Sequence, residues 1–355
     1  MKGSKDMKKT KVTLNFVLLL AFMLVLTACG NESAEPAEGS SELNEGDSSS
    51  VEFNIGVQSI PNVEILTKSL GLIEKNLEEM NVTVNWHHFD SGIDVNMAVA
   101  SGSIDAGLTG TPMAASGISQ DLPYKVVWIH DVLGDNEALV VKEDSGIQSL
   151  EDLQGKTIAV TFGSTPHYML LNALKLKNID ENSITFLDMP PAEMFASWEG
   201  NLIDGAYTWQ PVLDNLIGSE GEVIVTSGDL AAEGLITAEV AIASNNFIEE
   251  HPEIMEQYVA AFNEGVEFYR SSPDEAYKLV ADELEISVED AAQTMDQLIW
   301  LNASEQASEQ YLGGAFAEVL KDTADFLVDQ KSIADAPELD AFKSGIDSSF
   351  VESIK

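Results

Sequence analysis

Two segments of the chain share one plan that suits the binding of an anion. The stretches "AGLTGTPMAA" (106–115) and "AVTFGSTPHYMLL" (159–171) each run from a strand through glycine and threonine to a proline. Proline is favoured at the first helical position, so Thr111 and Thr165 are the predicted N-caps. The N-terminus of a helix presents free N–H groups and a partial positive charge, which attract anions.

The second start offers more donors than the first. Ser164, Thr165 and His167 add side-chain donors, and Gly163 lets the backbone approach a ligand. Gly110 belongs to the same predicted site in the first start. The alternative is that two helices simply begin this way, but two such starts after two strands favour one shared anion site.

The stretch "GNLIDGAYTWQP" (200–211) places an acid inside the pattern of an apolar strand. Aspartate is unfavourable in a strand, and an unpaired buried carboxylate is costly, so Asp204 needs either a ligand or a structural bond to backbone amides. A regular strand puts Asp204 and Trp209 on opposite faces. Both can reach one ligand only if the strand ends near Tyr207.

The composition narrows the classes of ligand and activity. The formal net charge is −42, and removing residues 1–28, with five lysines and one aspartate, leaves about −46, which repels nucleic acid. Arg270 is the only arginine, so an anion site must use backbone N–H, hydroxyl and indole donors. His87 and His88 are adjacent on a predicted strand and point to opposite faces, so we expect no metal site. No catalytic triad spacing or phosphate loop is evident.

The N-terminal segment has the features of an export signal. A basic head with five lysines precedes an apolar run at 12–26 that is shorter than the roughly 20 residues of a membrane span. "LTAC" (26–29) resembles a bacterial lipobox and predicts lipidation of Cys29, the only cysteine. Residues 29–50 are acidic and contain few apolar residues, so we expect a disordered tether that follows a signal peptide at 1–28.

From about residue 51, short apolar strands alternate with amphipathic stretches, which predicts an α/β fold with parallel or mixed sheets. The alternation restarts after 145–156, and the chain turns mostly helical after 238–244. This layout predicts a bilobed protein. Residues 51–140 and 241–355 would form lobe 1 and residues 141–240 lobe 2, with crossings near 140 and 240 and the ligand between the lobes.

Longer blocks resemble the substrate-binding proteins of bacterial taurine ABC transporters. They include "ASGSIDAG" (100–107), "GDNEALVVK" (134–142), "LQGKTIAVTFGSTPHYMLLNALK" (153–175) and "PPAEMFASWEGNLIDGAYTWQP" (190–211). The resemblance runs from about Asn54 to about Asp335. It implies the type II periplasmic-binding-protein fold and a permease partner with its cytoplasmic ATPase. It also implies a protein without catalysis or a cofactor, and we expect a monomer. The lipobox, which the family's Gram-negative members lack, predicts a lipid-anchored position on the outer face of the cell membrane.

Taurine carries a sulfonate and an ammonium, and the residues above offer partners for both. The helix starts at Gly110–Thr111 and at 164–167 suit the sulfonate. The candidates on the ammonium side are carboxylates, a ring face and an amide, namely Asp204, Glu137, Trp209 and Gln58. For Glu137 the alternative is a salt bridge at the hinge.

Besides a surface adhesin with no small ligand, two other functions remain open. One is a receptor for another alkanesulfonate or small anionic solute, because related binders share these helix starts. The other is an enzyme similar to the thiamine-precursor synthases, which have the same fold. That function would need a reactive group, and the only cysteine is assigned to the anchor.

Overall fold

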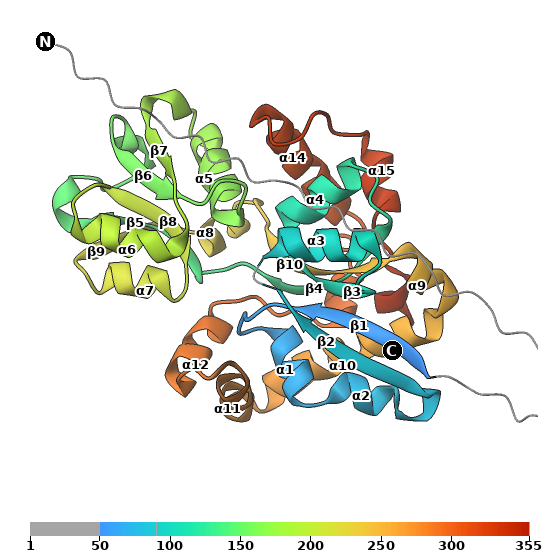
Figure 1. The fold of residues 1–355 in the computed structure, drawn as a ribbon. Coiled ribbons are helices and arrows are strands. Elements are labelled where there is room, and N and C mark those ends of the chain that lie inside the picture. Colours follow the sequence, from blue (N-terminus) through green and yellow to red (C-terminus); the bar gives the residue numbers. More distant parts are fainter. Residues whose placement is uncertain (1–49, 90, 355) are drawn as a thin grey trace, which may run out of the picture. The chain divides into compact units, whose positions relative to one another are not determined.

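Two five-stranded sheets, each with helices on both faces, organise the chain (Figure 1). The structure is a computed structural model and describes residues 50–89 and 91–354. The predicted signal peptide, Cys29 and most of the tether lie outside the described residues. The two sheets confirm the predicted bilobed α/β fold, and each sheet with its helices is called a lobe below.

Lobe 1 is built on a mixed sheet. Its strands in spatial order are β2 (Val82–His88), β1 (Val51–Val57), β3 (Ala106–Gly110), β10 (Ala238–Ser244) and β4 (Tyr124–Val132). The strands β1, β2 and β3 are parallel, whereas β10 is antiparallel to both of its neighbours. One face carries α1 (Val63–Ser69), α2 (Leu72–Asn76) and α10 (Pro252–Ser271), and the other carries α3 (Gly92–Ser101) and α4 (Thr111–Ser119) (Figure 1).

Lobe 2 repeats this arrangement with a smaller sheet. Its strands in spatial order are β7 (Thr185–Asp188), β6 (Thr157–Val160), β8 (Gly205–Trp209), β5 (Glu137–Lys142) and β9 (Gly221–Thr226). One core joins α5 (Thr165–Leu176) and α8 (Ser227–Ala232) to the sheet, and a second core holds α6 (Pro191–Glu199) and α7 (Val212–Ile217) on the other face. Strands covered on both faces are apolar throughout, which explains the short apolar runs in the sequence.

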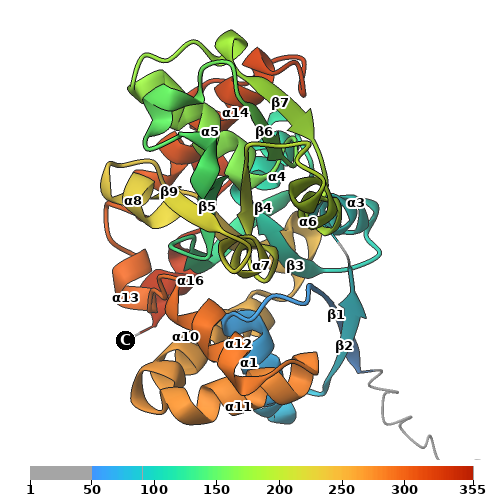
Figure 2. The same ribbon diagram turned by 90° about the vertical axis from the view of Figure 1, so that its left-hand side faces the viewer.

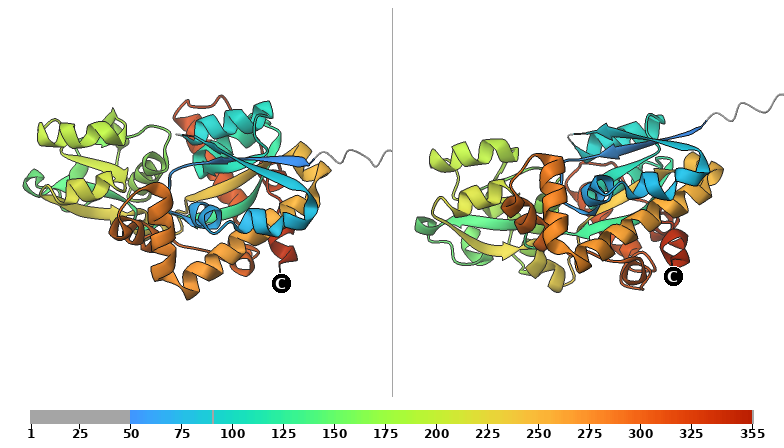
Figure 3. Two further views of the ribbon diagram at one scale, coloured as in Figure 1. Left: turned by 60° about the horizontal axis from the view of Figure 1, so that its bottom comes forward. Right: turned by 90° about the horizontal axis from the view of Figure 1, so that it is seen from below.

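The helical C-terminal region belongs mainly to lobe 1. The helix α9 (Asn245–Glu250) precedes α10. The helices after α10 are α11 (Pro273–Leu284), α12 (Val288–Asp296), α13 (Ala303–Gln306), α14 (Phe316–Asp329), α15 (Leu339–Ser344) and α16 (Ser349–Ser353). In α10, Ile254, Tyr258 and Phe262 recur at helical spacing and are buried, as the amphipathic pattern at 251–269 predicts. Figure 3 shows α10 to α12 in succession beside α1. The helix α14 packs on α4 and also reaches α5, where the Phe326 and Tyr168 ring centroids are 5.2 Å apart (Figure 2).

The chain crosses between the lobes after Val132 and again before Ala238. We expected the crossings near 140 and 240, and the first lies earlier because the whole of β5 belongs to lobe 2. The crossings bond to each other through Leu133 N–H and Thr237 C=O at 2.9 Å. A third segment joins them, since Asp135 N–H donates to Gln297 C=O at 3.0 Å.

Candidate ligand-binding site

A cavity of about 460 Å³ brings together residues of both lobes at the carboxyl ends of β1, β3, β6 and β8. Six of the nine predicted ligand residues line it, namely Gln58, Gly110, Glu137, Ser164, Thr165 and Trp209. Thr111, His167 and Asp204 do not. The position at the carboxyl ends of the strands is the one that α/β sheets favour for ligands.

The start of α5 forms one wall of the cavity. Ser164, not Thr165, is the N-cap, and its hydroxyl accepts from His167 N–H at 3.4 Å and donates to Thr161 C=O at 2.6 Å. The predicted cap is therefore off by one residue, because proline is also tolerated at the second helical position, where its missing N–H is not needed. Gly163 supports the turn with a φ of +78°, a conformation that favours glycine.

The start of α4 has the same shape but a different use for its threonine. Gly110 is the N-cap in extended conformation, so the predicted cap at Thr111 is again one residue late. The Thr111 hydroxyl donates to Ala238 C=O at 2.9 Å and accepts from Ala238 N–H at 2.8 Å. Thr111 is completely buried between α4 and β10, so its predicted side-chain contact with a ligand is corrected to a structural bond.

The two helix starts meet. A Cβ placed on Gly110 would lie 3.7 Å from Cγ2 of Thr165 and 4.0 Å from Oε1 of Glu239. The N-terminal ends of α4 and α5 therefore border one space rather than two. Their partial positive charges add at that point, which suits a single anion.

Glu137 stands at the first residue of β5, directly after the crossing. Its Oε1 accepts from the Thr165 hydroxyl at 2.5 Å, and its Oε2 accepts from the Ser227 hydroxyl at 3.0 Å. Burial raises the pKa of Glu137 to about 8, although these two bonds lower it and the charge of Glu239 raises it further. No ion pair to Glu137 occurs among the described residues, so its predicted alternative as a hinge salt bridge is wrong.

Trp209 and Gln58 lie at strand ends that open on the cavity. Trp209 ends β8 and is the cross-strand partner of Glu137. Gln58 follows β1, and its Nε2 donates to Leu108 C=O at 3.0 Å. That bond orients the amide and leaves its oxygen and its second N–H available to a ligand.

Asp204 lies outside the cavity, at the other end of β8. Its Oδ2 accepts from Thr157 N–H at 2.8 Å, and its own C=O accepts from Lys142 N–H at 3.0 Å. Five strand residues separate Asp204 from Trp209, which is about 16 Å at the usual rise of a strand. The ligand role of Asp204 is therefore corrected, and the structural alternative of a bond to backbone amides holds.

His167 also turns away from the cavity. Its Nδ1 accepts from Gly163 N–H at 3.1 Å, and its ring stacks on Phe162 with centroids 4.6 Å apart. Burial lowers the pKa of His167 to about 4, so the ring is neutral. The predicted donor is corrected to an acceptor that fixes the loop before α5.

The sequence-based prediction missed Glu239, a second carboxylate on the cavity wall. Glu239 lies near the start of β10, opposite Gly110 on β3 and Asp131 on β4. Burial raises the pKa of Glu239 to about 7. The available signal was an acid in the otherwise apolar stretch "AEVAIAS" (238–244), which is the same signal that drew attention to Asp204.

The residues that line the cavity include no lysine or arginine. Arg270 lies elsewhere, where its guanidinium donates to Trp300 C=O at 2.8 Å and to Glu305 at 2.6 Å. Within the described residues no group of His, Cys, Asp and Glu has the arrangement of a metal site. An anion in the cavity would therefore be held by helix N-termini and neutral donors, as the sequence predicts.

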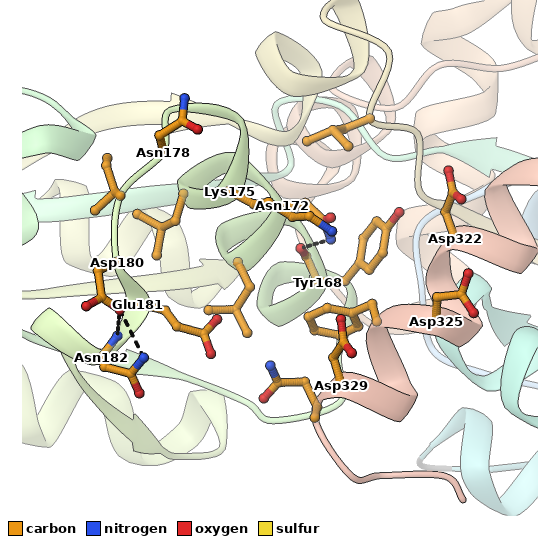
Figure 4. Close-up of a pocket in the computed structure, with 16 residues that line it drawn as sticks. Tyr168, Asn172, Lys175, Asn178, Asp180, Glu181, Asn182, Asp322, Asp325 and Asp329 are labelled. Atoms are coloured by element: carbon orange, nitrogen blue, oxygen red, sulfur yellow. Dashed lines mark hydrogen bonds between the residues drawn. The ribbon is translucent and has the colours of Figure 1, made fainter. Parts of the chain in front are cut away.

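A larger cavity of about 820 Å³ lies between α5 and α14 (Figure 4). Asp322, Asp325 and Asp329 line it from α14, while Lys175 lies on the α5 side. None of the predicted ligand residues lines this cavity, and its excess of carboxylates disfavours an anion. The smaller cavity is therefore the candidate site.

Known proteins are similar to this chain in sequence and in fold. Residues 78–276 match the family described as NMT1/THI5 like. The taurine-binding periplasmic protein of Escherichia coli (strain K12) is 33% identical over 262 residues, 72% of this chain and 80% of that protein. A putative aliphatic sulfonates-binding protein of Bacillus subtilis (strain 168) is 25% identical over 338 residues, 95% of each chain.

The crystal structure of the periplasmic aliphatic sulphonate binding protein SsuA from Escherichia coli superposes with a TM-score of 0.70 at 22% identity. The match covers 82% of this chain and 91% of that chain, which shows a shared fold. The chain therefore belongs to the NMT1/THI5-like family and is one of its taurine and sulfonate solute-binding proteins.

Proposed function

We propose that the protein is the extracytoplasmic receptor of an ABC importer, which binds taurine between its lobes and delivers it to the permease. The observation that carries this proposal is one cavity that combines two helix N-termini with two carboxylates, Glu137 and Glu239. A ligand with an anionic and a cationic end matches both features. A simple alkanesulfonate matches only the first.

The sulfonate is assigned to the space between Gly110 and Thr165. The two helix N-termini border that space, and the Thr165 hydroxyl is positioned there by its bond to Glu137. Each hydrogen bond to a charged group contributes about 1.5–3 kcal/mol, so a few such bonds replace an arginine.

The ammonium is assigned to the carboxylates. Glu137 already accepts from two hydroxyls, whereas no hydrogen bond or ion pair from another described residue reaches the carboxylate of Glu239. Glu239 is therefore the principal acceptor. Trp209 offers a ring face to the same cation.

Closure of the lobes would complete the site. Ile93 on α3 and Phe162 after β6 line the cavity from different lobes and are 55% and 47% exposed. Large apolar side chains at such exposure gain free energy when they are covered. Their burial over a bound ligand favours the closed form that a permease can recognise.

Titration calorimetry with taurine and ethanesulfonate tests the proposal, because the two ligands share the sulfonate and differ chiefly in the ammonium. We expect taurine to bind at least about tenfold more tightly, since ethanesulfonate leaves acceptors unpaired. Equal affinities would favour a general alkanesulfonate receptor. Binding of neither would reject both, and turnover of a bound ligand would favour the enzyme alternative.

The lipid anchor is a separate part of the proposal. Within the described residues no helix has the length and apolarity needed to cross a membrane. Cys29 in the lipobox lies outside those residues and is the proposed attachment point. We expect the wild-type protein to partition into detergent with a lipid mass increment and Cys29→Ala to lack both. A wild-type protein without the increment would contradict the anchor.

A further inference from the structure

A row of acids continues from the cavity wall into the core of lobe 1. Glu239 lines the cavity, and Asp131 is its cross-strand partner on β4. Glu64 on α1 lies beyond, with its Oε1 3.8 Å from Nε2 of His130. Asp131, Glu64 and His130 are 0% exposed, so only Glu239 in this row reaches solvent through the cavity.

Neither carboxylate oxygen of Asp131 accepts a hydrogen bond of ordinary geometry from a described residue. An unpaired carboxylate in such a place is far more stable when protonated. Burial raises the pKa of Asp131 well above its usual value, the charge of Glu239 raises it further, and the Asn62 amide only partly opposes the rise. Asp131 is therefore neutral beside an acid that opens on the cavity.

No lysine or arginine lines the cavity around Glu239. Asp131 on β4, Glu137 on β5 and Glu64 on α1 are close enough to Glu239 for their charges to interact. His130 lies next to Glu64, and His88 at the end of β2 lines the cavity. Burial lowers the pKa of His130 to about 3, so this ring is neutral. A cation that stabilises an ionised Glu239 must therefore come from a ligand.

We propose that Glu239 and Asp131 form the specificity element for an amine-bearing sulfonate, and that the ligand's ammonium displaces a proton held by this carboxylate pair. This inference rests on the proposed function. In the step, the Glu239 carboxylic acid loses its proton to solvent through the cavity, and the ammonium takes its place beside the carboxylate. No covalent bond to the ligand forms. A ligand without an amine leaves the proton in place and gains no ion pair with Glu239, so we expect it to bind more weakly than taurine.

Calorimetry in two buffers of different ionisation enthalpy measures the protons released on binding. With the pKa of free Glu239 at about 7, we expect taurine to release about 0.5–1 proton at about pH 6 and much less at about pH 8.5. Below neutrality, taurine affinity should increase about three- to tenfold for each unit by which the pH is raised. Ethanesulfonate serves as the matched ligand, and its binding should release none.

Variants locate the proton. We expect Glu239→Gln to abolish the release and to weaken taurine binding at least about tenfold at about pH 8, with little loss for ethanesulfonate. Asp131→Asn keeps the shape and removes the second proton site, so taurine should still bind and the release should persist if the proton comes from Glu239. Glu222→Gln, an exposed acid on β9, is the matched control and should release protons as the wild type does.

The outcomes separate this inference from the proposed function. Taurine binding without proton release, or release that persists in Glu239→Gln, would overturn the proton displacement and leave the taurine receptor standing. Equal losses for both ligands in Glu239→Gln would overturn its role in specificity. Failure of the wild type to bind taurine would overturn both.

Discussion

The two Thr-Pro helix starts have nearly the same sequence and opposite uses. In α4 the Thr111 hydroxyl bonds both backbone groups of Ala238 and is buried away from the ligand. In α5 the Thr165 hydroxyl donates to Glu137 and lines the cavity. The difference comes from the neighbouring strand, because β10 passes against the start of α4, whereas an acid at the first residue of β5 faces the start of α5. A motif therefore specifies the backbone, and its neighbours decide the chemistry.

Removing the Thr111 hydroxyl should have the largest effect, and on stability. Thr111→Val leaves the buried N–H and C=O of Ala238 unpaired, which costs about 2–4 kcal/mol in the free energy of unfolding. Taurine affinity of the folded protein should change less than about threefold. Denaturant unfolding and calorimetry on the same sample check both values. A stable variant with weak binding would reverse the assigned roles of the two threonines.

Thr165→Val is the matched change in α5, and its main effect should fall on the ligand. It removes one of the two hydroxyls that hold Glu137 beside the proposed sulfonate site. Taurine affinity should fall by about 1.5–3 kcal/mol. The measurement is titration calorimetry at a temperature where the variant is fully folded. Unchanged affinity would place the sulfonate elsewhere.

The acid that distinguishes the α5 start should also leave a signature in the pH dependence of stability. The pKa of Glu137 is about 8 in the folded protein and lies near 4.5 when unfolded. Its contribution is therefore fully present below about pH 4.5 and is lost as the pH rises through about 8, with a slope of up to about 1.4 kcal/mol per pH unit. Denaturant unfolding of the ligand-free protein should show a shallower decline for Glu137→Gln. Equal slopes in wild type and variant would contradict the raised pKa.

The smallest expected effect on stability comes from exchanging the N-cap residues of α4 and α5. A Cβ on Gly110 meets only ordinary contacts, and its φ of −80° suits any residue, so Gly110→Ser should stabilise α4 by a few tenths of a kcal/mol. Ser164→Gly should destabilise α5 by a similar amount. Thermal unfolding of ligand-free samples measures both. A destabilising Gly110→Ser would show that the two starts differ in backbone as well as in neighbours.

Local rules in the sequence were enough to predict the layout and the two helix starts. Proline with a preceding polar residue begins a helix because the first N–H groups need no partner within it. The same freedom makes the exact first residue ambiguous, and both caps lie one residue earlier than predicted. The alternation of apolar strands and amphipathic helices likewise predicted two α/β lobes.

The acids could not be assigned from the sequence because strand direction decides which end of a strand meets the cavity. Asp204 precedes β8, which runs parallel to β6, so the acid lies at the end away from the ligand. Glu239 opens β10, which is antiparallel to β3, so its first residues lie at the cavity edge. Both acids interrupt apolar strands in the same way, and only the sheet pairing distinguishes them.

The backbone bonds between the crossings have a mechanical consequence. Two crossing segments and the segment around Gln297 lie side by side, and the Gln297 carbonyl oxygen would be 2.1 Å from a Cβ on Gly134. Three backbone segments bonded edge to edge resist shear within their plane and bend more easily across it. We therefore expect the lobes to rotate about this connection. Any residue larger than glycine at 134 would push the first crossing and the segment around Gln297 apart.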